Sequence, residues 1–247
     1  MTAYLGTSDI GATAIKRSLG ARVRQLLQGR SEQKTAVFVT GGRSVDFWLV
    51  SLLECGELLN NVGFFLTDTF DPSDALAEGR SETNEENLLA SGFAEAISKG
   101  VVRRDQLFLP DHQTTSLDEL ARAYSDTLIE FRGEATADLI FLSSGGGSYT
   151  PNGPEDPGHC AGLPHGRSEL LDSEIPFIAL EGMPKPPSRR VTMTPRLMRT
   201  ASQMYLFVLG SQKANALKNI KARRPLSKCP ACIVHEVDDS YVVTDLE

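Results

Sequence analysis

A glycine-rich turn near the start of the chain joins a β-favouring segment to a helical pattern. Residues 35–40 predict a buried strand, and the apolar spacing from Val45 onward predicts a helix. The turn between them consists of Gly41, Gly42, Arg43 and Ser44. Amides at a helix N-terminus attract anions, paired glycines permit close backbone approach, and a serine hydroxyl can donate to a phosphate oxygen. The turn is therefore a candidate phosphate site, with an ordinary tight turn between strand and helix as the alternative.

Three other loops follow predicted buried strands and are suited to ligand binding. Asp68 follows residues 62–67, the triplet Gly145, Gly146 and Gly147 follows residues 137–142, and Lys213 follows residues 204–209. The carboxyl ends of parallel strands meet at one edge of a sheet, where α/β proteins bind their ligands. We therefore expect these loops to converge with the glycine-rich turn, although they are scattered in the sequence.

Helical and strand patterns alternate along the chain. Apolar spacing predicts helices around 15–27, 45–52, 88–97, 116–131 and 211–220. Strands are predicted at 35–40, 62–67, 107–109, 137–142, 175–180, 190–194 and 204–209, with two short ones near Ile233 and at 241–243. This order indicates an α/β fold with a mostly parallel, Rossmann-like central sheet, helices on both faces, and a small C-terminal or accessory strand region. Residues 1–247 are expected to form a single domain.

Composition and charge exclude several functional classes. The chain has 40% hydrophobic and 23% charged residues, which is ordinary for a globular protein. A net charge of -7 argues against a general nucleic-acid binder, which would normally present a basic surface. The sequence has neither a run of apolar residues long enough to span a bilayer nor a signal-peptide pattern. These features predict a cytoplasmic protein without a membrane partner.

The four cysteines, Cys55, Cys160, Cys229 and Cys232, are too scattered for a disulfide framework. The spacing of Cys229 and Cys232 is that of a redox-active pair or of half a zinc site. A structural zinc site needs a second ligand pair, which only the neighbourhood of His159 and Cys160 offers. We favour the simpler interpretation of two small residues near the start of a strand, without a metal.

Several short motifs occur in a fixed order along the chain. They are Thr40-Gly41-Gly42-Arg43-Ser44, Phe64-Phe65-Leu66-Thr67-Asp68, Thr83-Asn84, Asp138-Leu139-Ile140-Phe141-Leu142, Pro184-Lys185-Pro186-Pro187, Arg190-Val191-Thr192-Met193-Thr194-Pro195 and Gly210-Ser211-Gln212-Lys213-Ala214. Together they resemble the family of 6-phosphogluconolactonases and glucosamine-6-phosphate deaminases over most of the chain. The segments at 83–84 and 184–187 are closer to the lactonase branch.

The resemblance implies a protein that binds a sugar phosphate without a metal or other cofactor. The phosphate would be held by Gly41, Gly42, Arg43, Ser44 and Lys213. Asn84 and Arg190 would bind the rest of the substrate. The family's Asp-Glu-Arg motif is replaced by Asp68-Thr69-Phe70, which lacks one carboxylate and the guanidinium.

The family's catalytic histidine aligns with this sequence in two ways. Without a gap, Ser148 takes its position and supplies no base of suitable pKa. With an insertion, the segment 155–161 matches the family's Glu-Asp-Gly-His-Thr-Ala, and His159 would activate water against a lactone carbonyl. Asp156 or Asp68 would then orient His159.

Three functions are consistent with these features. The leading hypothesis is hydrolysis of a phosphorylated sugar lactone, which the resemblance connects with the pentose phosphate pathway. A catalytically impaired sugar-phosphate-binding homologue is suggested by the altered Asp-Glu-Arg motif, and an amino-sugar-phosphate isomerase or deaminase by the segment 229–235. The sequence specifies neither the sugar nor whether the chain forms a homo-oligomer.

Overall fold

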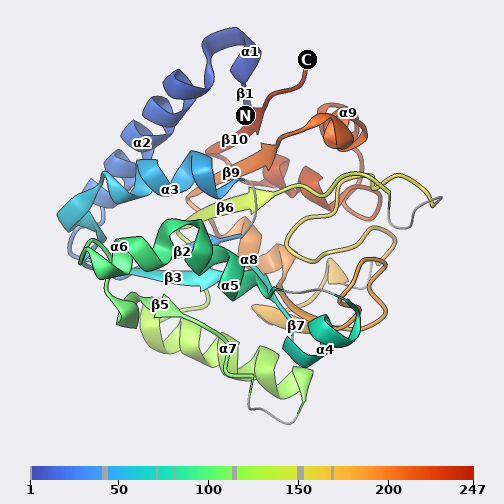
Figure 1. Ribbon diagram of the computed structural model, residues 1–247, viewed down its shortest axis with the longest axis horizontal. Coiled ribbons are helices and arrows are strands. Elements are labelled where there is room, and N and C mark those ends of the chain that lie inside the picture. The colour runs from blue at the N-terminus through green and yellow to red at the C-terminus, as the bar shows by residue number, and fades with distance from the viewer. Residues whose placement is uncertain are drawn as a thin grey trace.

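The computed structural model describes residues 2–40, 44–70, 72–79, 82–112, 116–148, 153–167 and 170–247. At its centre lies a seven-stranded sheet in the order β1-β10-β9-β6-β2-β3-β5 (Figure 1). The strands are β1 (Ala3–Gly6), β2 (Thr35–Val39), β3 (Val62–Leu66), β5 (Leu107–Phe108), β6 (Leu139–Ser143), β9 (Gln203–Val208) and β10 (Ser240–Thr244). Each neighbouring pair is parallel, which confirms the predicted α/β fold.

Helices cover both faces of the sheet, as predicted from the alternating pattern. The α-helices of the described residues are α1 (Thr7–Ile10), α2 (Ala12–Gln28), α3 (Val45–Leu53), α4 (Pro72–Ala77), α5 (Asn84–Leu88), α6 (Ala94–Ser98), α7 (Leu117–Arg132), α8 (Pro195–Arg199) and α9 (Ala214–Lys221). A π-helical turn, Leu89–Phe93, joins α5 to α6, and 3₁₀ turns occur at Gly56–Leu59, Arg104–Gln106, Ser211–Lys213 (η5) and Pro230–Glu236 (η6).

Two hydrophobic cores lie on the two sides of the sheet. Successive side chains of a strand point to opposite faces, so β2 contributes to both cores. Val37 and Val39 pack in the core with residues of α2 and α3, whereas Ala36 and Phe38 pack in the core with residues of α7. This two-sided burial explains why the central strands are apolar runs without a polar face.

A second, antiparallel sheet has the order β4-β8-β7. Its strands are β4 (Asp68–Thr69), β7 (Phe177–Leu180) and β8 (Arg190–Met193). This small sheet is the predicted accessory strand region, and it combines one strand at 68–69 with two strands between 177 and 193. The segment that starts at Asp68 was predicted as a loop, but it pairs with β8, with Asp68 opposite Thr192.

Two end segments differ from the sequence prediction. The expected strand near Ile233 is the 3₁₀ helix η6, which begins at Pro230. Proline fixes φ near the helical value and suits the first turn of a helix, so the apolar residues that follow it pack as a buried helical segment. The sequence patterns also missed β1, which adds to the edge of the sheet beside β10.

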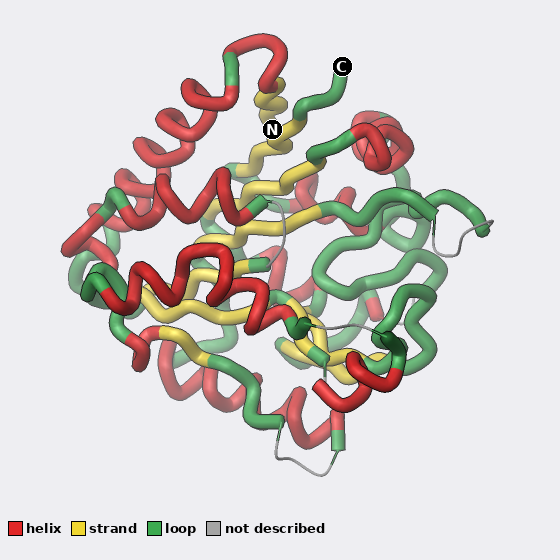
Figure 2. The backbone as a smooth tube through the Cα atoms, in the orientation of Figure 1, coloured by secondary structure: helices red, strands yellow, loops and turns green. Residues whose placement is uncertain are grey.

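The loops that carry the candidate site residues leave one edge of the central sheet. In the register, Val39 of β2 pairs with Leu66 of β3 and with Phe141 of β6, and Ser143 of β6 pairs with Phe207 of β9. Figure 2 shows irregular segments concentrated on the side where β6 and β9 end.

None of the helices in the described parts of the chain is long and apolar enough to cross a membrane.

Candidate active site

After β6 the chain forms a long loop, and the returning part of this loop runs antiparallel to its beginning. The amide of Gly145 donates to the carbonyl of His159 at 2.7 Å, and the amide of Asp156 donates to the carbonyl of Gly147 at 2.7 Å. Isolated bridges at each end of this ladder pair Ser144 with Cys160 and Ser148 with Glu155. The return path brings His159 back to the glycine triplet, which favours the alignment with an insertion over the ungapped one.

Asp156 and His159 form a hydrogen-bonded pair at this return. The Nδ1 atom of His159 contacts Oδ2 of Asp156, and Oδ1 of Asp156 accepts the amides of Gly158 and His159, both at 2.9 Å. The Asp156 carboxylate is fully buried, whereas the His159 side chain is 26% exposed. Burial raises the pKa of Asp156, but the hydrogen bonds from His159 and from the two amides outweigh it, so that the pKa lies well below its ordinary value.

An ionised Asp156 determines the tautomer of His159. A carboxylate can only accept hydrogen bonds, so the His159 Nδ1 that contacts it carries a proton. In a neutral imidazole the other nitrogen, Nε2, is then the basic one. The pair thus has the arrangement of a general base and the carboxylate that orients it.

Lys185 completes the surroundings of the Asp156 carboxylate. Its ammonium group lies 3.0 Å from Oδ2 of Asp156 and donates to the carbonyl of Gly146 at 2.8 Å. Lys185 therefore ties the glycine triplet to the Asp156–His159 pair. No role for this lysine was predicted from the sequence. Its place in the Pro184-Lys185-Pro186-Pro187 motif is the signal that the sequence offered.

The glycine triplet is shaped by what lies against it. A methyl group at Gly145 would overlap the imidazole of His159 and the carboxylate of Asp156, and one at Gly146 would lie 2.5 Å from Cγ of Lys213. Only residues without a side chain allow these close approaches. The triplet thus separates the Asp156–His159 pair from Lys213 by a single layer of backbone.

The predicted phosphate residues lie partly within the described chain. Lys213 ends the turn η5 before α9, and the preceding residue, Gln212, accepts the amide of Gly147 at 2.8 Å. Ser44, at the start of α3, shares a hydrogen bond of 2.7 Å with Ser143 at the end of β6. Both residues therefore lie next to the segment that carries the glycine triplet. The predicted Gly41, Gly42 and Arg43 lie outside the described residues.

Asp68, Asn84 and Arg190 form a second group. Asp68 is buried, and its carboxylate accepts a hydrogen bond from Nη1 of Arg190 at 3.0 Å. The backbone carbonyl of Asp68 accepts a hydrogen bond from the side-chain amide of Asn84 at 2.9 Å. Arg190 also donates to the carbonyls of Pro186 and Pro187. Of the two carboxylates considered for orienting His159, Asp156 makes the contact and Asp68 is paired with Arg190.

The two groups share a small pocket. It is lined by His159, Gly162, Pro164, Met183, Pro184, Lys185 and Arg190. The backbone of Gly162 fits closely against Asp68, because a methyl group at Gly162 would lie 3.3 Å from that carboxylate. The pocket thus has an imidazole, an ammonium and a guanidinium on its walls, a combination suited to an anionic or carbonyl-bearing ligand.

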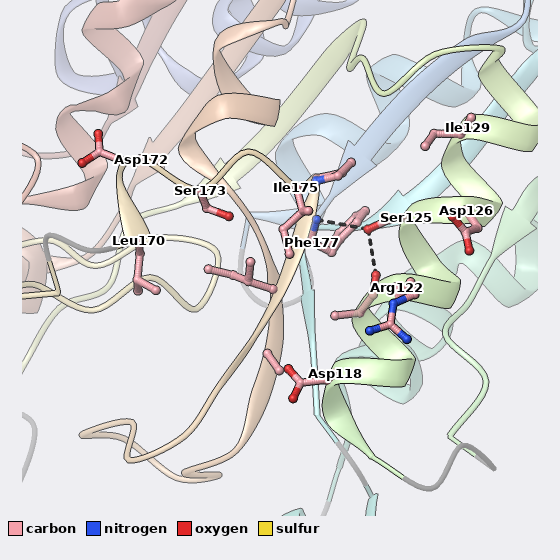
Figure 3. Close-up of a pocket in the computed structure, with 14 residues that line it drawn as sticks. Asp118, Arg122, Ser125, Asp126, Ile129, Leu170, Asp172, Ser173, Ile175 and Phe177 are labelled. Carbon is pink, nitrogen blue, oxygen red and sulfur yellow. Dashed lines mark hydrogen bonds between the residues drawn. The ribbon is translucent and has the colours of Figure 1, made fainter.

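A more spacious surface pocket lies elsewhere, between α7 and β7 (Figure 3). Asp118, Arg122 and Asp126 of α7 face Ile175 and Phe177 across it. Ser125 accepts the amide of Phe177 at 3.3 Å and donates to the carbonyl of Ala121 at 2.7 Å, so its hydroxyl is used within the fold. None of the predicted site residues lines this pocket, and we assign the candidate site to the edge of the central sheet.

The fold and the site together define an α/β protein whose ligand-binding loops gather at the carboxyl edge of a parallel sheet. The chain belongs to the family of glucosamine-6-phosphate isomerases and 6-phosphogluconolactonase, whose sequence model matches residues 8–243. A 6-phosphogluconolactonase of Borreliella burgdorferi is 27% identical over 220 residues, which cover 87% of this chain and 86% of that protein.

Solved structures share the fold. A 6-phosphogluconolactonase from Trypanosoma cruzi superposes with a TM-score of 0.71 at 17% identity, covering 99% of this chain and 94% of that one. A monomeric glucosamine-6-phosphate deaminase superposes with a TM-score of 0.67 at 15% identity, covering 99% of this chain and 97% of that one. Both branches of the family thus have the architecture of this chain.

Proposed function

We propose that this protein hydrolyses a phosphorylated sugar lactone, with 6-phosphogluconolactone as the first substrate to test. The observation that carries the proposal is the Asp156–His159 pair, in which the buried carboxylate holds Nδ1 and makes Nε2 the basic nitrogen. The lactonase from Borreliella burgdorferi, which matches most of the chain, supports the choice of substrate.

The reaction uses His159 twice. Nε2 of His159 removes a proton from water while the water oxygen attacks the lactone carbonyl carbon, giving a tetrahedral intermediate. The intermediate collapses, the bond between the carbonyl carbon and the ring oxygen breaks, and the proton returns from His159 to that ring oxygen. The product is an open-chain sugar acid phosphate. Asp156 stays ionised throughout and stabilises the protonated imidazole.

The other predicted residues bind and position the substrate. Lys213 and Ser44, with the backbone at 41–43, hold the phosphate, as a lysine and a glycine-rich turn suit a dianion. Asp68, Asn84 and Arg190 form one hydrogen-bonded unit beside the pocket and would contact the sugar. This mechanism requires neither a metal ion nor a nucleotide.

The test is turnover of freshly prepared 6-phosphogluconolactone above its spontaneous hydrolysis. We expect wild type to accelerate the reaction and His159→Ala to lose at least about a hundredfold in kcat, the usual lower contribution of a general base. His165→Ala is the matched control, because His165 is a second histidine in the same loop region and lies outside the proposed machinery. Equal activity of His159→Ala and wild type would refute the assignment.

Two other outcomes correspond to the other hypotheses. Release of ammonia from glucosamine 6-phosphate without lactone hydrolysis would indicate the deaminase function, which the similarity to a monomeric deaminase structure makes worth testing. Thermal stabilisation by 6-phosphogluconate without turnover of either substrate would indicate a binding protein, because a ligand that binds only the native state raises its stability.

A further inference from the structure

Arg190 is buried against the loop between β7 and β8, and most of its hydrogen bonds go to that loop. Its Nε donates to the carbonyl of Pro187 at 3.1 Å, and its Nη2 lies 3.0 Å from the carbonyl of Pro186 and 3.5 Å from that of Lys185. Its Nη1 donates to the carboxylate of Asp68 at 3.0 Å. A guanidinium group has five N–H donors in one plane, so most of them are used to fix this loop within the fold.

The loop places Lys185 on the carboxylate of Asp156. The Lys185 ammonium lies 3.0 Å from Oδ2 of Asp156, which is the oxygen that Nδ1 of His159 also contacts. The side chain of Asp156 is fully buried, and that of Lys185 is only partly exposed. One carboxylate oxygen is therefore shared by two donors, an ammonium group and an imidazole.

A lysine in this place opposes the protonation of His159. A carboxylate next to an imidazole favours the protonated ring, because it stabilises the positive charge. The Lys185 ammonium contacts the same carboxylate oxygen, carries a charge of the same sign as an imidazolium, and offsets this attraction. Lys185 therefore favours the neutral imidazole, which is the form that can accept a proton from water.

The other titratable groups near His159 in the described parts of the chain do not replace Lys185. They are Asp68, Glu155, Cys160, Arg190, Lys213 and Cys229. The charge of Arg190 is balanced by Asp68, Glu155 is exposed, and both cysteines are buried. Lys213 lies against Gly146, on the other side of the glycine triplet. Among these cations, Lys185 is the one in contact with the carboxylate that holds the imidazole.

We propose that Arg190 and Lys185 are positioning residues for the general base. Arg190 fixes the loop, and the Lys185 ammonium that this loop places on Asp156 keeps His159 in its neutral form. The catalytic meaning of this inference rests on the proposed function, because only a general base needs a neutral imidazole. Arg190 thereby has a role in addition to contact with the sugar.

The first experiment measures the protonation of His159 directly by NMR. The four histidines are labelled with ¹⁵N, and the signals of His159 are assigned by their absence in His159→Ala. In Lys185→Met we expect the midpoint of the His159 titration about one pH unit above that of wild type, because a charge within about 4 to 6 Å produces shifts of this size. An unchanged midpoint in Lys185→Met would overturn the proposal.

Two variants serve as controls for the charge. Lys185→Arg keeps a cation beside Asp156 and should titrate close to wild type. Arg189→Met removes the neighbouring arginine, which is exposed and pairs with Asp74 and Glu181, and should leave the His159 midpoint in place. A shift in Arg189→Met as large as that in Lys185→Met would show a general charge effect and would contradict the specific role of Lys185. Unchanged signals of the other histidines confirm that each variant is folded.

The second experiment separates the hydrogen bonds of Arg190 from its charge. Arg190→Lys keeps a cation beside Asp68, but an ammonium group lacks the planar fork that reaches the carbonyls of the loop. The His159 midpoint should rise in Arg190→Lys, in the same direction as in Lys185→Met. The double variant should titrate like Lys185→Met alone, because residues that act through one contact are not additive. A wild-type midpoint in Arg190→Lys, or additive shifts, would overturn the role of Arg190.

Kinetics test whether the neutral form matters for turnover. The acid limb of kcat/KM for 6-phosphogluconolactone should move with the NMR midpoint, to about one pH unit higher in Lys185→Met, and KM should change much less. A higher KM with an unchanged acid limb would show that Lys185 binds the substrate and would overturn the proposal.

The NMR titrations need no turnover, so the two proposals fail separately. If wild type does not hydrolyse the lactone, the proposed function fails, while NMR still decides whether Lys185 and Arg190 keep His159 neutral. If wild type is active and the midpoint does not move in Lys185→Met, only the present inference fails.

Discussion

The contacts of the Asp156 carboxylate allow a sharp prediction for Asp156→Asn. Asparagine has nearly the same shape, but one of its two oxygens is replaced by an NH₂ donor. Oδ1 accepts hydrogen bonds from two backbone amides, and Oδ2 accepts one from the Lys185 ammonium. In either orientation of the asparagine side chain, its NH₂ group would therefore face a group that is itself a hydrogen-bond donor. An NH₂ group at the Oδ2 position would also turn His159 to the tautomer with its proton on Nε2.

The expected loss in kcat is therefore large. A histidine with its proton on Nε2 cannot accept a proton from water, so Asp156→Asn should forfeit most of the contribution of a general base, about 10² to 10⁴ in kcat. KM should change much less, because the proposed phosphate contacts through Lys213 and Ser44 remain. Steady-state kinetics on 6-phosphogluconolactone separates the two parameters.

The same substitution should lower stability in a way that depends on pH. Lys185 loses its charged partner, and because its side chain is 28% exposed we expect a loss of only about 1 to 2 kcal/mol, below the full range for a hydrogen bond to a charged group. The pKa of Asp156 is lower in the folded than in the unfolded state, so its ionised form stabilises the fold above the unfolded pKa of about 4. That stabilisation is lost as the pH falls towards the folded value. The difference between wild type and Asp156→Asn should shrink accordingly in urea unfolding below about pH 4.

Glu155→Gln provides the control, because Glu155 is an exposed acidic residue next to Asp156. It should retain the kcat and the stability of wild type. An Asp156→Asn protein that is folded and retains the kcat of wild type would refute the inference that Asp156 holds the tautomer of His159.

Three further substitutions test other parts of the structure. Lys213→Ala should weaken the binding of 6-phosphogluconate, measured by calorimetry, by about 1.5 to 3 kcal/mol. Lys221→Ala, which changes an exposed lysine, is the control. An unchanged affinity of Lys213→Ala would remove Lys213 from the phosphate site. Lys185→Met should lower kcat by about tenfold, because one charged hydrogen bond to the Asp156 carboxylate is lost. Lys185→Arg keeps the charge and should recover part of this loss. Equal kinetics for the two variants would argue against a role of the charge. Asp138→Ala should lower the free energy of unfolding by about 2 to 4 kcal/mol. The buried carboxylate accepts a hydrogen bond from the amide of Ala36 at 2.8 Å and pairs with two arginines. A loss below about 0.5 kcal/mol in urea unfolding would contradict this prediction.

Much of the fold was predictable because its signals are local. The strands β2, β3 and β6 are apolar runs that are buried on both faces, and α7 shows helical spacing after a serine N-cap. The segment at 230–236 was misread because an apolar run bounded by proline fits a buried strand and a buried helical turn equally well. The pairing of β4 with β8 had no local signal, since it joins residues that are far apart in the chain.

The residue types that could do chemistry can be read from the sequence alone, and so can the gathering of their loops at one edge of the sheet. Parallel strands end at a common edge, so Asp68, the glycine triplet and Lys213 were expected near one another before any contact was known. The sequence also left two alignments of the histidine open. The partner of His159 follows from the fold, because it depends on how the loop after β6 returns antiparallel to its own beginning.

The contact of Lys185 with Gly146 and the contact of Cys229 with Gly158 likewise depend on the tertiary structure. Both contacts join segments that are separated by dozens of residues, and no local pattern of charge or hydrophobicity encodes such a distance. Backbone periodicity is a property of neighbouring residues, whereas a hydrogen bond between remote side chains exists only after the core has fixed the positions of the segments that carry them.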